Sequence, residues 1–241
     1  MKINYKLLLL GLAIFLNACT DAKKKKTESE TETETTHQHE DAHIKKDTNT
    51  ANKHMHQSSV EDLIKRFESP ERDAYQQPDK VLAYLGDVSG KKIIDIGAGS
   101  GYFSVKLADK GAYVIAADVS DEFQEALQKR IEENKIANIE LRKIPYDDPG
   151  LAENEVDMVL IVNTYHHIDN RIQYFSRVKK GMKTDGELIV IDFYKKELPV
   201  GPKPDHKIAK DIVIDELTKA GFTDLNVNTE LLHYQYIIRA K

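Results

Sequence analysis

Residues Lys91 to Leu107, KKIIDIGAGSGYFSVKL, decide the fold of this 241-residue chain. An apolar run from Ile93 to Ile96 leads into three glycines at alternate positions, Gly97, Gly99 and Gly101, and a helical apolar pattern follows them. Strand, glycine turn and helix make up the first unit of a nucleotide-binding α/β sheet. Glycine lets the backbone turn sharply and a ligand come close, and the helix start offers N–H groups to that ligand.

The spacing of the glycines narrows the choice of ligand. A dinucleotide fingerprint, G-x-G-x-x-G, would place its third glycine where Tyr102 stands. A phosphate-binding P-loop needs a lysine directly after its last glycine, and no lysine follows Gly101. The pattern is instead D-x-G-x-G-x-G, with Asp95 on the predicted strand. The alternative interpretation is a glycine-rich turn in an unrelated strand–helix unit.

Strands and helices alternate along the rest of the chain. Further strands are predicted over Tyr113–Asp118, Ile139–Ile144, Val156–Val162, Glu187–Phe193, Phe222–Val227 and Leu231–Ile238. Ser120 is placed to cap the helix after the second strand. Because strands alternate with helices, we expect a doubly wound, Rossmann-like, mainly parallel seven-stranded sheet. Its last two strands are close enough in the chain to pair antiparallel at the C-terminal end.

Two helices are expected before the first strand. Ser58 and Glu61 have the spacing of a capping box, and the apolar residues up to Phe67 form one helix face. A second helix begins at Pro78, since proline is favoured at the first helical position. We therefore expect the folded domain to span residues 58–241, with these helices as a lid or packing layer.

Composition excludes several kinds of protein. The formal net charge is −5 and 31% of the residues are charged, so bulk charge gives no indication of a nucleic-acid partner. The single cysteine excludes an intrachain disulfide and a cysteine-rich metal site. No apolar stretch reaches the length of about 18–20 residues that a membrane-spanning helix needs.

Residues 1–18 have the three-part layout of a secretory signal peptide. Lys2 and Lys6 form a basic start, Leu7 to Leu16 are mostly apolar, and the lone cysteine, Cys19, follows shortly after. The sequence LNAC that ends at Cys19 resembles a bacterial lipobox, in which the cysteine is lipidated. We therefore expect a protein of the bacterial cell envelope, attached to a membrane through this lipid anchor. The alternatives are an uncleaved signal anchor, or a chance cysteine in a cytoplasmic protein.

Residues 19–57 contain almost no apolar residues. Lysine, threonine, glutamate and histidine dominate, so the segment cannot bury enough surface to offset the entropy of ordering, and a disordered tether is predicted. Five histidines lie in it: His37, His39, His43, His54 and His56. They could hold a divalent metal loosely, but we favour a solvated linker without metal because the composition implies no fixed geometry.

Ligands of doubly wound sheets bind beyond the carboxyl ends of the strands, where the strand order switches. Asp118 ends the second strand, and a carboxylate there can accept both hydrogen bonds of a ribose diol. It follows Asp95 at close to the spacing of about 20 residues expected of a ribose-binding acid. The alternative is an exposed turn aspartate. Beyond the fourth strand lie Asn163, His166 and His167.

The stretch from Asp95 to Gly101 resembles motif I of the class I S-adenosylmethionine-dependent methyltransferases. Other segments resemble small bacterial members of the ubiquinone/menaquinone-biosynthesis-like superfamily of these enzymes. These segments are Arg72–Pro78 (RDAYQQP), Thr164–His167 (TYHH), Gly201–Lys207 (GPKPDHK) and Tyr234–Tyr236 (YQY). The resemblance extends from about Phe67 to the C-terminus.

This resemblance implies an enzyme that transfers a methyl group from S-adenosylmethionine to a small-molecule acceptor. It assigns cofactor binding to Asp95, Gly97, Gly99, Gly101, Asp118 and Asn163, with Asp147 meeting the adenine amino group. The signature [D/N]-P-P-Y of many N-methyltransferases is not met, because Thr164 and Tyr165 follow Asn163. Methylation of nucleic-acid bases is therefore not expected, and the pattern identifies neither the acceptor nor the oligomeric state.

Two other functions remain open on the sequence alone. An exported binding module could use the same fold to hold an adenosine-containing ligand, since a fold does not fix a function. An NAD-dependent oxidoreductase is disfavoured by Tyr102 at the place of the third glycine.

His166 and His167 are candidates for acid–base chemistry, because an imidazole accepts a proton near neutral pH. Adjacent residues point in different directions, so at most one of the two is expected to face the acceptor. Tyr165 is a further catalytic candidate, as a hydrogen-bond donor or an aromatic wall for the sulfonium. His206 is an outside candidate on the proline-rich segment. The alternative is that both adjacent histidines are structural.

Overall fold

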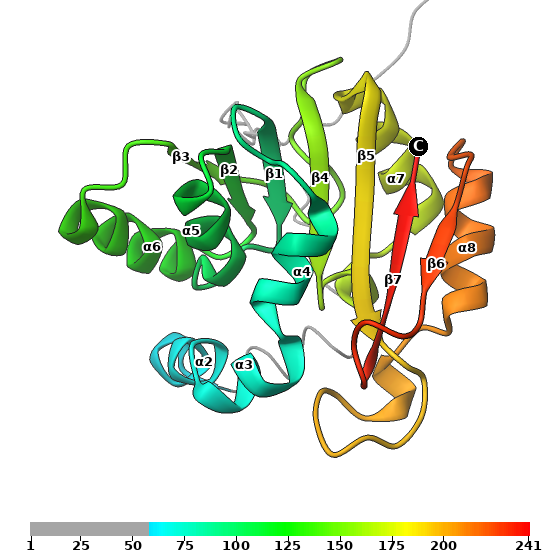
Figure 1. The fold of residues 1–241 in the computed structure, drawn as a ribbon, viewed down its shortest axis with the longest axis horizontal. Helices are drawn as coiled ribbons and strands as arrows, with labels where there is room; N and C mark the ends of the chain where they lie inside the picture. The colour runs from blue at the N-terminus through cyan, green and yellow to red at the C-terminus, as the bar shows by residue number, and fades with distance from the viewer. Residues whose placement is uncertain (1–57) are drawn as a thin grey trace, which may run out of the picture. The chain divides into compact units, whose positions relative to one another are not determined.

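The computed structural model describes residues 58–241. In this part of the chain a seven-stranded sheet is flanked by helices (Figure 1). The predicted signal peptide (residues 1–18), lipidation of Cys19 and tether (residues 19–57) lie outside the described residues.

The strand order is β3-β2-β1-β4-β5-β7-β6. The strands are β1 Lys92–Ile96, β2 Tyr113–Asp118, β3 Ile139–Lys143, β4 Val156–Val162, β5 Met182–Phe193, β6 Asn226–Asn228 and β7 Gln235–Ala240. Strands β1 to β5 pair in parallel, whereas β7 is antiparallel to both β5 and β6. This order confirms the predicted fold class. It also puts the switch point between β1 and β4, where the chain reverses its direction across the sheet.

The helices precede the sheet or connect its strands. They are α2 Val60–Phe67, α3 Pro70–Gln76, α4 Pro78–Leu85, α5 Tyr102–Asp109, α6 Asp121–Asn134, α7 Arg171–Gly181 and α8 Lys210–Lys219. Two short 3-10 turns, η1 Tyr165–His167 and η2 Pro204–His206, complete the described elements. None of the helices within residues 58–241 has the length and apolar character needed to cross a membrane.

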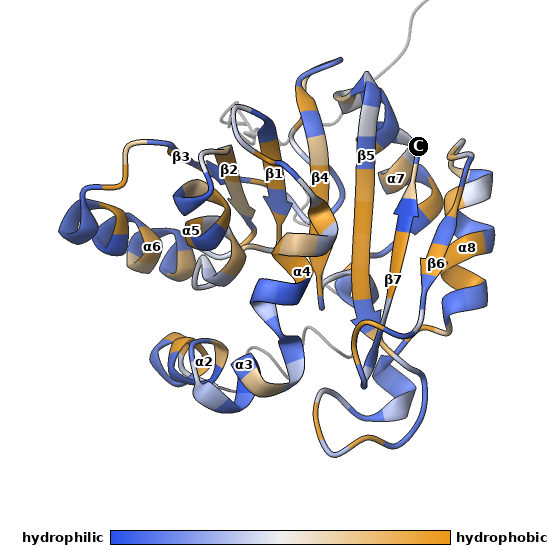
Figure 2. Ribbon diagram, viewed as in Figure 1, coloured by the Kyte–Doolittle hydropathy of each residue, from blue (hydrophilic) through white to orange (hydrophobic). Residues whose placement is uncertain are grey.

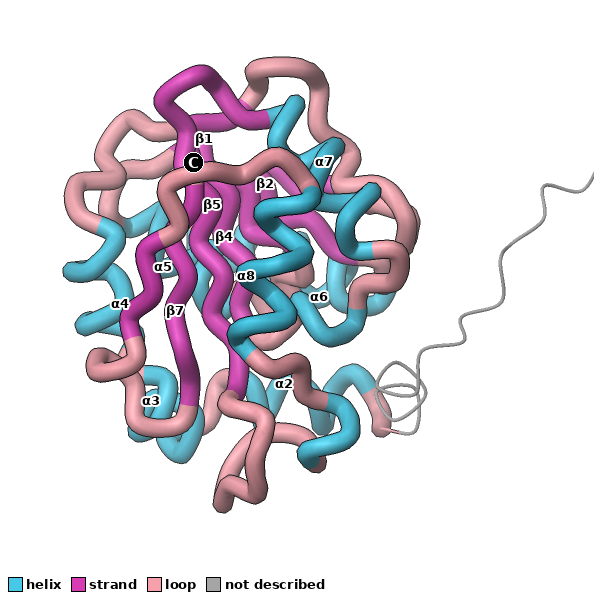
Figure 3. The backbone as a smooth tube through the Cα atoms, turned by 90° about the vertical axis from the view of Figure 1, so that its right-hand side faces the viewer, coloured by secondary structure: helices cyan, strands magenta, loops and turns pink. Residues whose placement is uncertain are grey.

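The two faces of the sheet bury alternate residues of each strand, as period-two strands covered on both sides must. Ile93 and Met158 face the side covered by α4 and α5, while Ile94 and Val159 face the side covered by α7 and α8. Figure 2 shows the strands as largely apolar and the helices as apolar on one side only. In the rotated view of Figure 3, α4 and α5 lie on one side of the strands and α7 and α8 on the other.

Three predictions about the N-terminal region and β5 need correction. Segment Pro70–Gln76 forms an additional helix, α3, capped by Ser69, whose hydroxyl accepts the Arg72 N–H. The cap of α2 is Ser59, one residue later than predicted, and its side chain accepts the Asp62 N–H at 3.1 Å. β5 begins at Met182 rather than Glu187, because Met182 pairs with Val156 before a bulge shifts the register.

The last two strands were predicted too early in the chain. Asn228 Oδ1 accepts the N–H groups of Glu230 and Leu231 at 3.0 and 2.9 Å, so these residues form a turn and not the start of β7. Phe222 lies in the turn that ends α8, where its N–H donates to Leu217 O, and it is buried in the core. Only Asn226–Asn228 is left to pair with β7.

Candidate functional site

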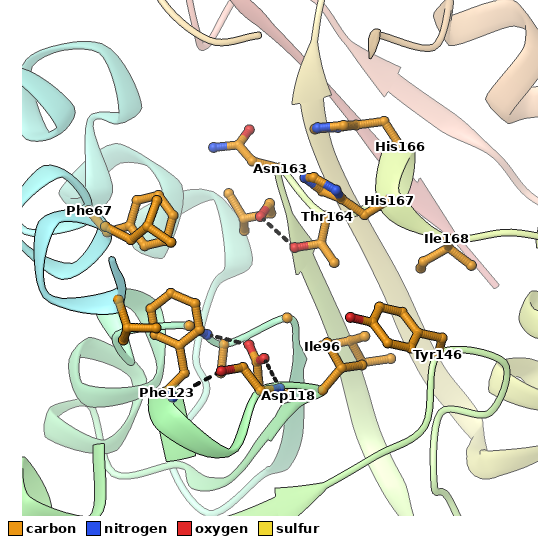
Figure 4. A pocket seen from close by; sticks show the side chains of 18 of the residues that line it. Phe67, Ile96, Asp118, Phe123, Tyr146, Asn163, Thr164, His166, His167 and Ile168 are labelled. Atoms are coloured by element: carbon orange, nitrogen blue, oxygen red, sulfur yellow. Dashed lines mark hydrogen bonds between the residues drawn. The ribbon is translucent and has the colours of Figure 1, made fainter. Parts of the chain in front are cut away.

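A cavity of about 870 Å³ opens at the carboxyl ends of β1, β2 and β4, at the switch point of the sheet. Its walls come from the glycine loop after β1, the end of β2, the turn after β4 and helices α2 and α3. Figure 4 shows Asn163, His166 and His167 along one wall, with Phe67 and Phe123 opposite them. Phe67 and Phe123 stack with ring centroids 5.9 Å apart.

Gly97 and Gly99 form the floor of the glycine loop at this cavity. Gly97 has φ +76°, and a Cβ there would come within 2.4 Å of the Thr164 side chain. Gly99 has φ +54°, and a Cβ there would meet only the Phe67 ring, at 3.6 Å. Both positions need glycine for their left-handed backbone, and the close approach of Thr164 is a second reason at Gly97.

Gly101 and Asp95, which were expected to contact the cofactor, do not line the cavity. A Cβ on Gly101 would come within 2.4 Å of Leu127, so this glycine lets α5 start close against α6. Asp95 is buried and accepts the Ser104 hydroxyl at 2.7 Å, and burial raises the pKa of its carboxyl to about 6. Both residues therefore stabilise the glycine loop on the side that faces away from the cavity.

Asp118 lies at the cavity and organises the loop at the same time. Its Oδ2 accepts the Gly99 N–H at 2.8 Å, and its Oδ1 accepts the Ser120 N–H at 2.9 Å. The residue is only 7% exposed, which excludes an exposed turn aspartate, and burial raises the pKa of its carboxyl. A carboxylate oxygen has two lone pairs, so both oxygens retain capacity for a ribose diol. The predicted cap of α6 is confirmed, because the Ser120 hydroxyl accepts the Phe123 N–H.

Asp147, expected at the adenine, is exposed and does not line the cavity. The backbone carbonyl of Asp147 accepts from Arg177 Nη1 at 2.6 Å, which holds this turn against α7. Ile144 and Tyr146 face the cavity instead. Tyr146, the residue before Asp147, therefore lies at the wall where Asp147 was expected.

His166 and Asp192 form a buried pair across two strand ends. His166 Nδ1 lies 2.9 Å from Asp192 Oδ2 and 3.0 Å from Oδ1, and Asp192 is fully buried. A carboxylate only accepts, so Nδ1 carries the hydrogen and Nε2 of the neutral ring carries the lone pair. His166 lines the cavity, so this orientation is that of a general base held by a carboxylate. Asp192 lies near the end of β5, and nothing in the sequence pairs it with a histidine 26 residues earlier.

His167 also lines the cavity and stacks on His166, with ring centroids 4.3 Å apart. Burial, followed by the neighbouring His166, lowers the pKa of His167 to about 3, so the ring stays neutral at ordinary pH. His206 on η2 does not line the cavity. Its charge contributes only a smaller lowering of the His167 pKa.

Tyr165 does not fit its expected catalytic role. The side chain is fully buried, stacks on Phe175 at 4.8 Å and donates to Glu216 Oε2 at 2.8 Å. Burial raises the pKa of its hydroxyl, and the residue lies outside the cavity wall. Tyr165 points into the core from η1, because successive residues of the turn project in different directions; His166 is thereby directed to the cavity.

Arg72 is the functional candidate that the sequence analysis did not identify. Its guanidinium lines the cavity between the rings of Tyr102, at 4.0 Å, and Phe67, at 5.5 Å. Among the described residues it makes no ion pair; its Nη1 donates to the Phe67 carbonyl at 3.2 Å, and its buried Nε has no hydrogen-bond partner. Burial lowers the pKa of Arg72. Arg72 is half-buried and has no ion-pair partner of its own within residues 58–241, so it is suited to bind an anionic group of a ligand.

The chain is similar in sequence to known methyltransferases. A family model described as "Methyltransferase domain" matches residues 94–190. The ubiquinone biosynthesis O-methyltransferase of Acinetobacter baylyi is 25% identical over 174 residues, which cover 63% of this chain and 73% of that protein. An uncharacterized methyltransferase of Mycobacterium tuberculosis is 27% identical over 99 residues, but the match covers only 39% of its length.

Solved structures give the same fold. A SAM-dependent methyltransferase from Aquifex aeolicus has a TM-score of 0.70 and 25% identity, covering 76% of this chain and 98% of its own. The phosphoethanolamine N-methyltransferase 2 of Haemonchus contortus, solved with S-adenosyl-L-methionine, has a TM-score of 0.59 at 15% identity, with 69% and 52% covered. Together with the cavity at the switch point and the glycine loop, these similarities show the fold of the class I S-adenosylmethionine-dependent methyltransferases, and the chain is an S-adenosylmethionine-dependent methyltransferase.

Proposed function

We propose that this enzyme methylates a hydroxyl or thiol of a small-molecule acceptor, with His166 as the general base. The observation that carries the proposal is the His166–Asp192 pair at the cavity wall. S-adenosylmethionine supplies an activated methyl group on a sulfonium. With that ligand bound, His166 Nε2 would take the proton of the acceptor as its oxygen or sulfur bonds the methyl carbon. The methyl–sulfur bond would break with its electron pair left on the sulfur, giving S-adenosylhomocysteine, and Asp192 would stabilise the imidazolium.

Several residues that line the cavity are suited to bind individual groups of S-adenosylmethionine. Asp118 suits the ribose diol, and Gly97 and Gly99 let the ligand approach the loop. Arg72 suits the α-carboxylate of the methionine part, the only anionic group that the cofactor carries. Asn163 lies between the glycine loop and the base, beside this same part of the cavity.

The charges at the wall favour an oxygen or sulfur acid over an amine. The acidic residues that line the cavity are Asp118, Asp121 and Glu122, all at the β2–α6 end. The walls around the base are instead imidazole, aromatic or uncharged, as in His167, Phe193 and Pro202. An ammonium acceptor would find no carboxylate there to bind its charge, because Asp192 is fully buried behind His166.

The test is an acceptor survey with methyl-labelled S-adenosylmethionine. Matched sets of phenols, thiols and primary amines are incubated with the enzyme, and label in the product is measured. We expect transfer to members of the phenol or thiol sets, at a rate that rises as the acceptor pKa falls toward that of an imidazole. Transfer to amines alone would contradict the assignment of a hydroxyl or thiol acceptor.

We also propose that the protein is lipid-anchored through Cys19 to a membrane of the bacterial cell envelope. The support is the signal-peptide layout of residues 1–18 and the position of the lone cysteine directly after it. We expect the wild-type protein in the membrane fraction and Cys19→Ser in the soluble or unprocessed fraction. Fractionation with mass measurement of the N-terminus decides this: a soluble wild-type protein that starts at Met1 would contradict the anchor.

A further inference from the structure

The side-chain amides of three residues form a closed ring of hydrogen bonds beside the cavity, which we call the amide ring. Gln76 Nε2 donates to Gln235 Oε1 at 3.0 Å, and Gln235 Nε2 donates to Asn163 Oδ1 at 2.5 Å. Asn163 Nδ2 closes the ring by donating to Gln76 Oε1 at 3.1 Å. Gln76 and Gln235 are fully buried. The ring thus joins α3, the end of β4 and the start of β7, which are far apart in the sequence.

The amide ring works only with side chains that both donate and accept. A buried amide without a partner costs about 1–3 kcal/mol, so three of them are stable together because each satisfies the next. An apolar side chain at any position removes two of the three bonds. A carboxylate also breaks the ring, because it has no hydrogen to donate, whereas a neutral carboxylic acid has both a donor and an acceptor.

Asn163 is the member of the ring that reaches the functional site. Its φ of +58° is left-handed, a conformation that asparagine adopts more readily than most other non-glycine residues. Asn163 and Thr164 line the cavity, and His166 follows two residues later. The ring therefore holds this turn at Asn163, and Asp192 holds it at His166.

The other two members connect the turn to the remaining parts of the site. Gln235 pairs in the sheet with Phe193, the residue after Asp192. The amide ring therefore lies next to Asp192, the carboxylate that binds His166. Gln76 lies one helical turn after Arg72 on α3, and residues at this spacing project from the same side of a helix. The amide ring thus links α3, which carries Arg72, to the turn that carries His166.

We infer that the amide ring positions the turn from Asn163 to His166 for cofactor binding and methyl transfer, which makes Gln76 and Gln235 positioning residues. The part that concerns His166 rests on the proposed function. The part that concerns Asn163 and Thr164 does not, because it is measured by cofactor affinity alone.

The experiment compares Gln76→Met and Gln76→Glu in the full chain, with affinity for S-adenosylhomocysteine measured by calorimetry from about pH 6 to 9. We expect Gln76→Met to bind about tenfold more weakly at every pH. Burial raises the pKa of a carboxyl at this position, so Gln76→Glu is neutral at low pH and completes the ring. Its affinity should be close to wild type there and should fall toward that of Gln76→Met as rising pH ionises the acid.

Two more variants separate positioning from general packing. Gln235→Met should weaken binding as Gln76→Met does, and the double variant should lose little more, because either change already breaks the ring. Gln128→Met, which replaces an exposed glutamine of α6 bonded only to Glu132, is the control and should bind normally. Where Gln76→Met does not fold, the pH dependence of Gln76→Glu still decides the question.

Wild-type affinity in both methionine variants would overturn the inference, and so would a Gln76→Glu profile that parallels Gln76→Met at every pH. These outcomes differ from a failure of the proposed function. If His166 is not the base, the rate of transfer in His166→Ala stays normal while the affinities of the ring variants still change.

Discussion

Replacing His166 by alanine is expected to lower the rate of methyl transfer about a hundredfold or more, with the affinity for S-adenosylhomocysteine unchanged. The Nε2 atom is the proton acceptor at the cavity wall, and removing a positioned general base costs about 10²–10⁴ in rate. A hundredfold loss corresponds to about 2.7 kcal/mol of barrier. The measurement is a single-turnover rate at saturating cofactor with a phenol or thiol acceptor, beside calorimetry for binding.

Asp192→Asn and His167→Ala are the matched variants. An amide at position 192 keeps the shape of the carboxylate but stabilises an imidazolium poorly, so we expect a loss of at least tenfold. His167→Ala should change the rate only a few-fold, because burial lowers the pKa of His167 to about 3 and its ring is a weak proton acceptor. A wild-type rate in His166→Ala, or a larger loss in His167→Ala, would assign the base elsewhere.

Replacing Arg72 by glutamine is expected to weaken S-adenosylhomocysteine binding by at least tenfold while leaving 5′-methylthioadenosine binding unchanged. The two ligands share the adenosine, but only the first carries the methionine carboxylate that Arg72 suits. Hydrogen bonds to charged groups contribute about 1.5–3 kcal/mol, and 1.4 kcal/mol is a factor of ten in affinity. Calorimetric titration of both ligands measures the difference.

Lys106→Gln is the control for this prediction. Lys106 also lies over the Tyr102 ring, at 4.3 Å, but it does not line the cavity, so its loss should leave the ratio of the two affinities unchanged. An equal loss of affinity for both ligands in Arg72→Gln would show that Arg72 stabilises helices α2 and α3 and does not bind the carboxylate.

Much of the fold followed from local sequence patterns. The glycine stretch after Asp95 and the period-two apolar strands led to the sheet, since each pattern constrains the residues beside it in the chain. The errors lie where short-range hydrogen bonds compete with strand pairing, as at Asn228, or where a polar segment such as Pro70–Gln76 has no apolar period to mark a helix. Propensity is weak there, and tertiary contacts decide.

The candidate site was predictable only in part. Asp118, Gly97, Gly99 and Asn163 lie at the cavity because strand ends and the turns after them reach the switch point in any sheet of this kind. Asp95 and Tyr165 are on the same segments but point away from it. The direction of each side chain depends on how the strand twists and how the turn packs, and sequence spacing fixes neither.

The sequence by itself determined the strand–glycine–helix unit and the alternation of strands and helices after it, because those depend on neighbours in the chain, and the resemblance of its motifs to a known family indicated the cofactor. Only the tertiary structure decided which residues work together. The pairing of His166 with Asp192, the packing of Arg72 on the Tyr102 ring and the amide ring all join segments far apart in the chain. Such contacts arise from sheet register and helix packing, which bring together side chains that no local pattern relates.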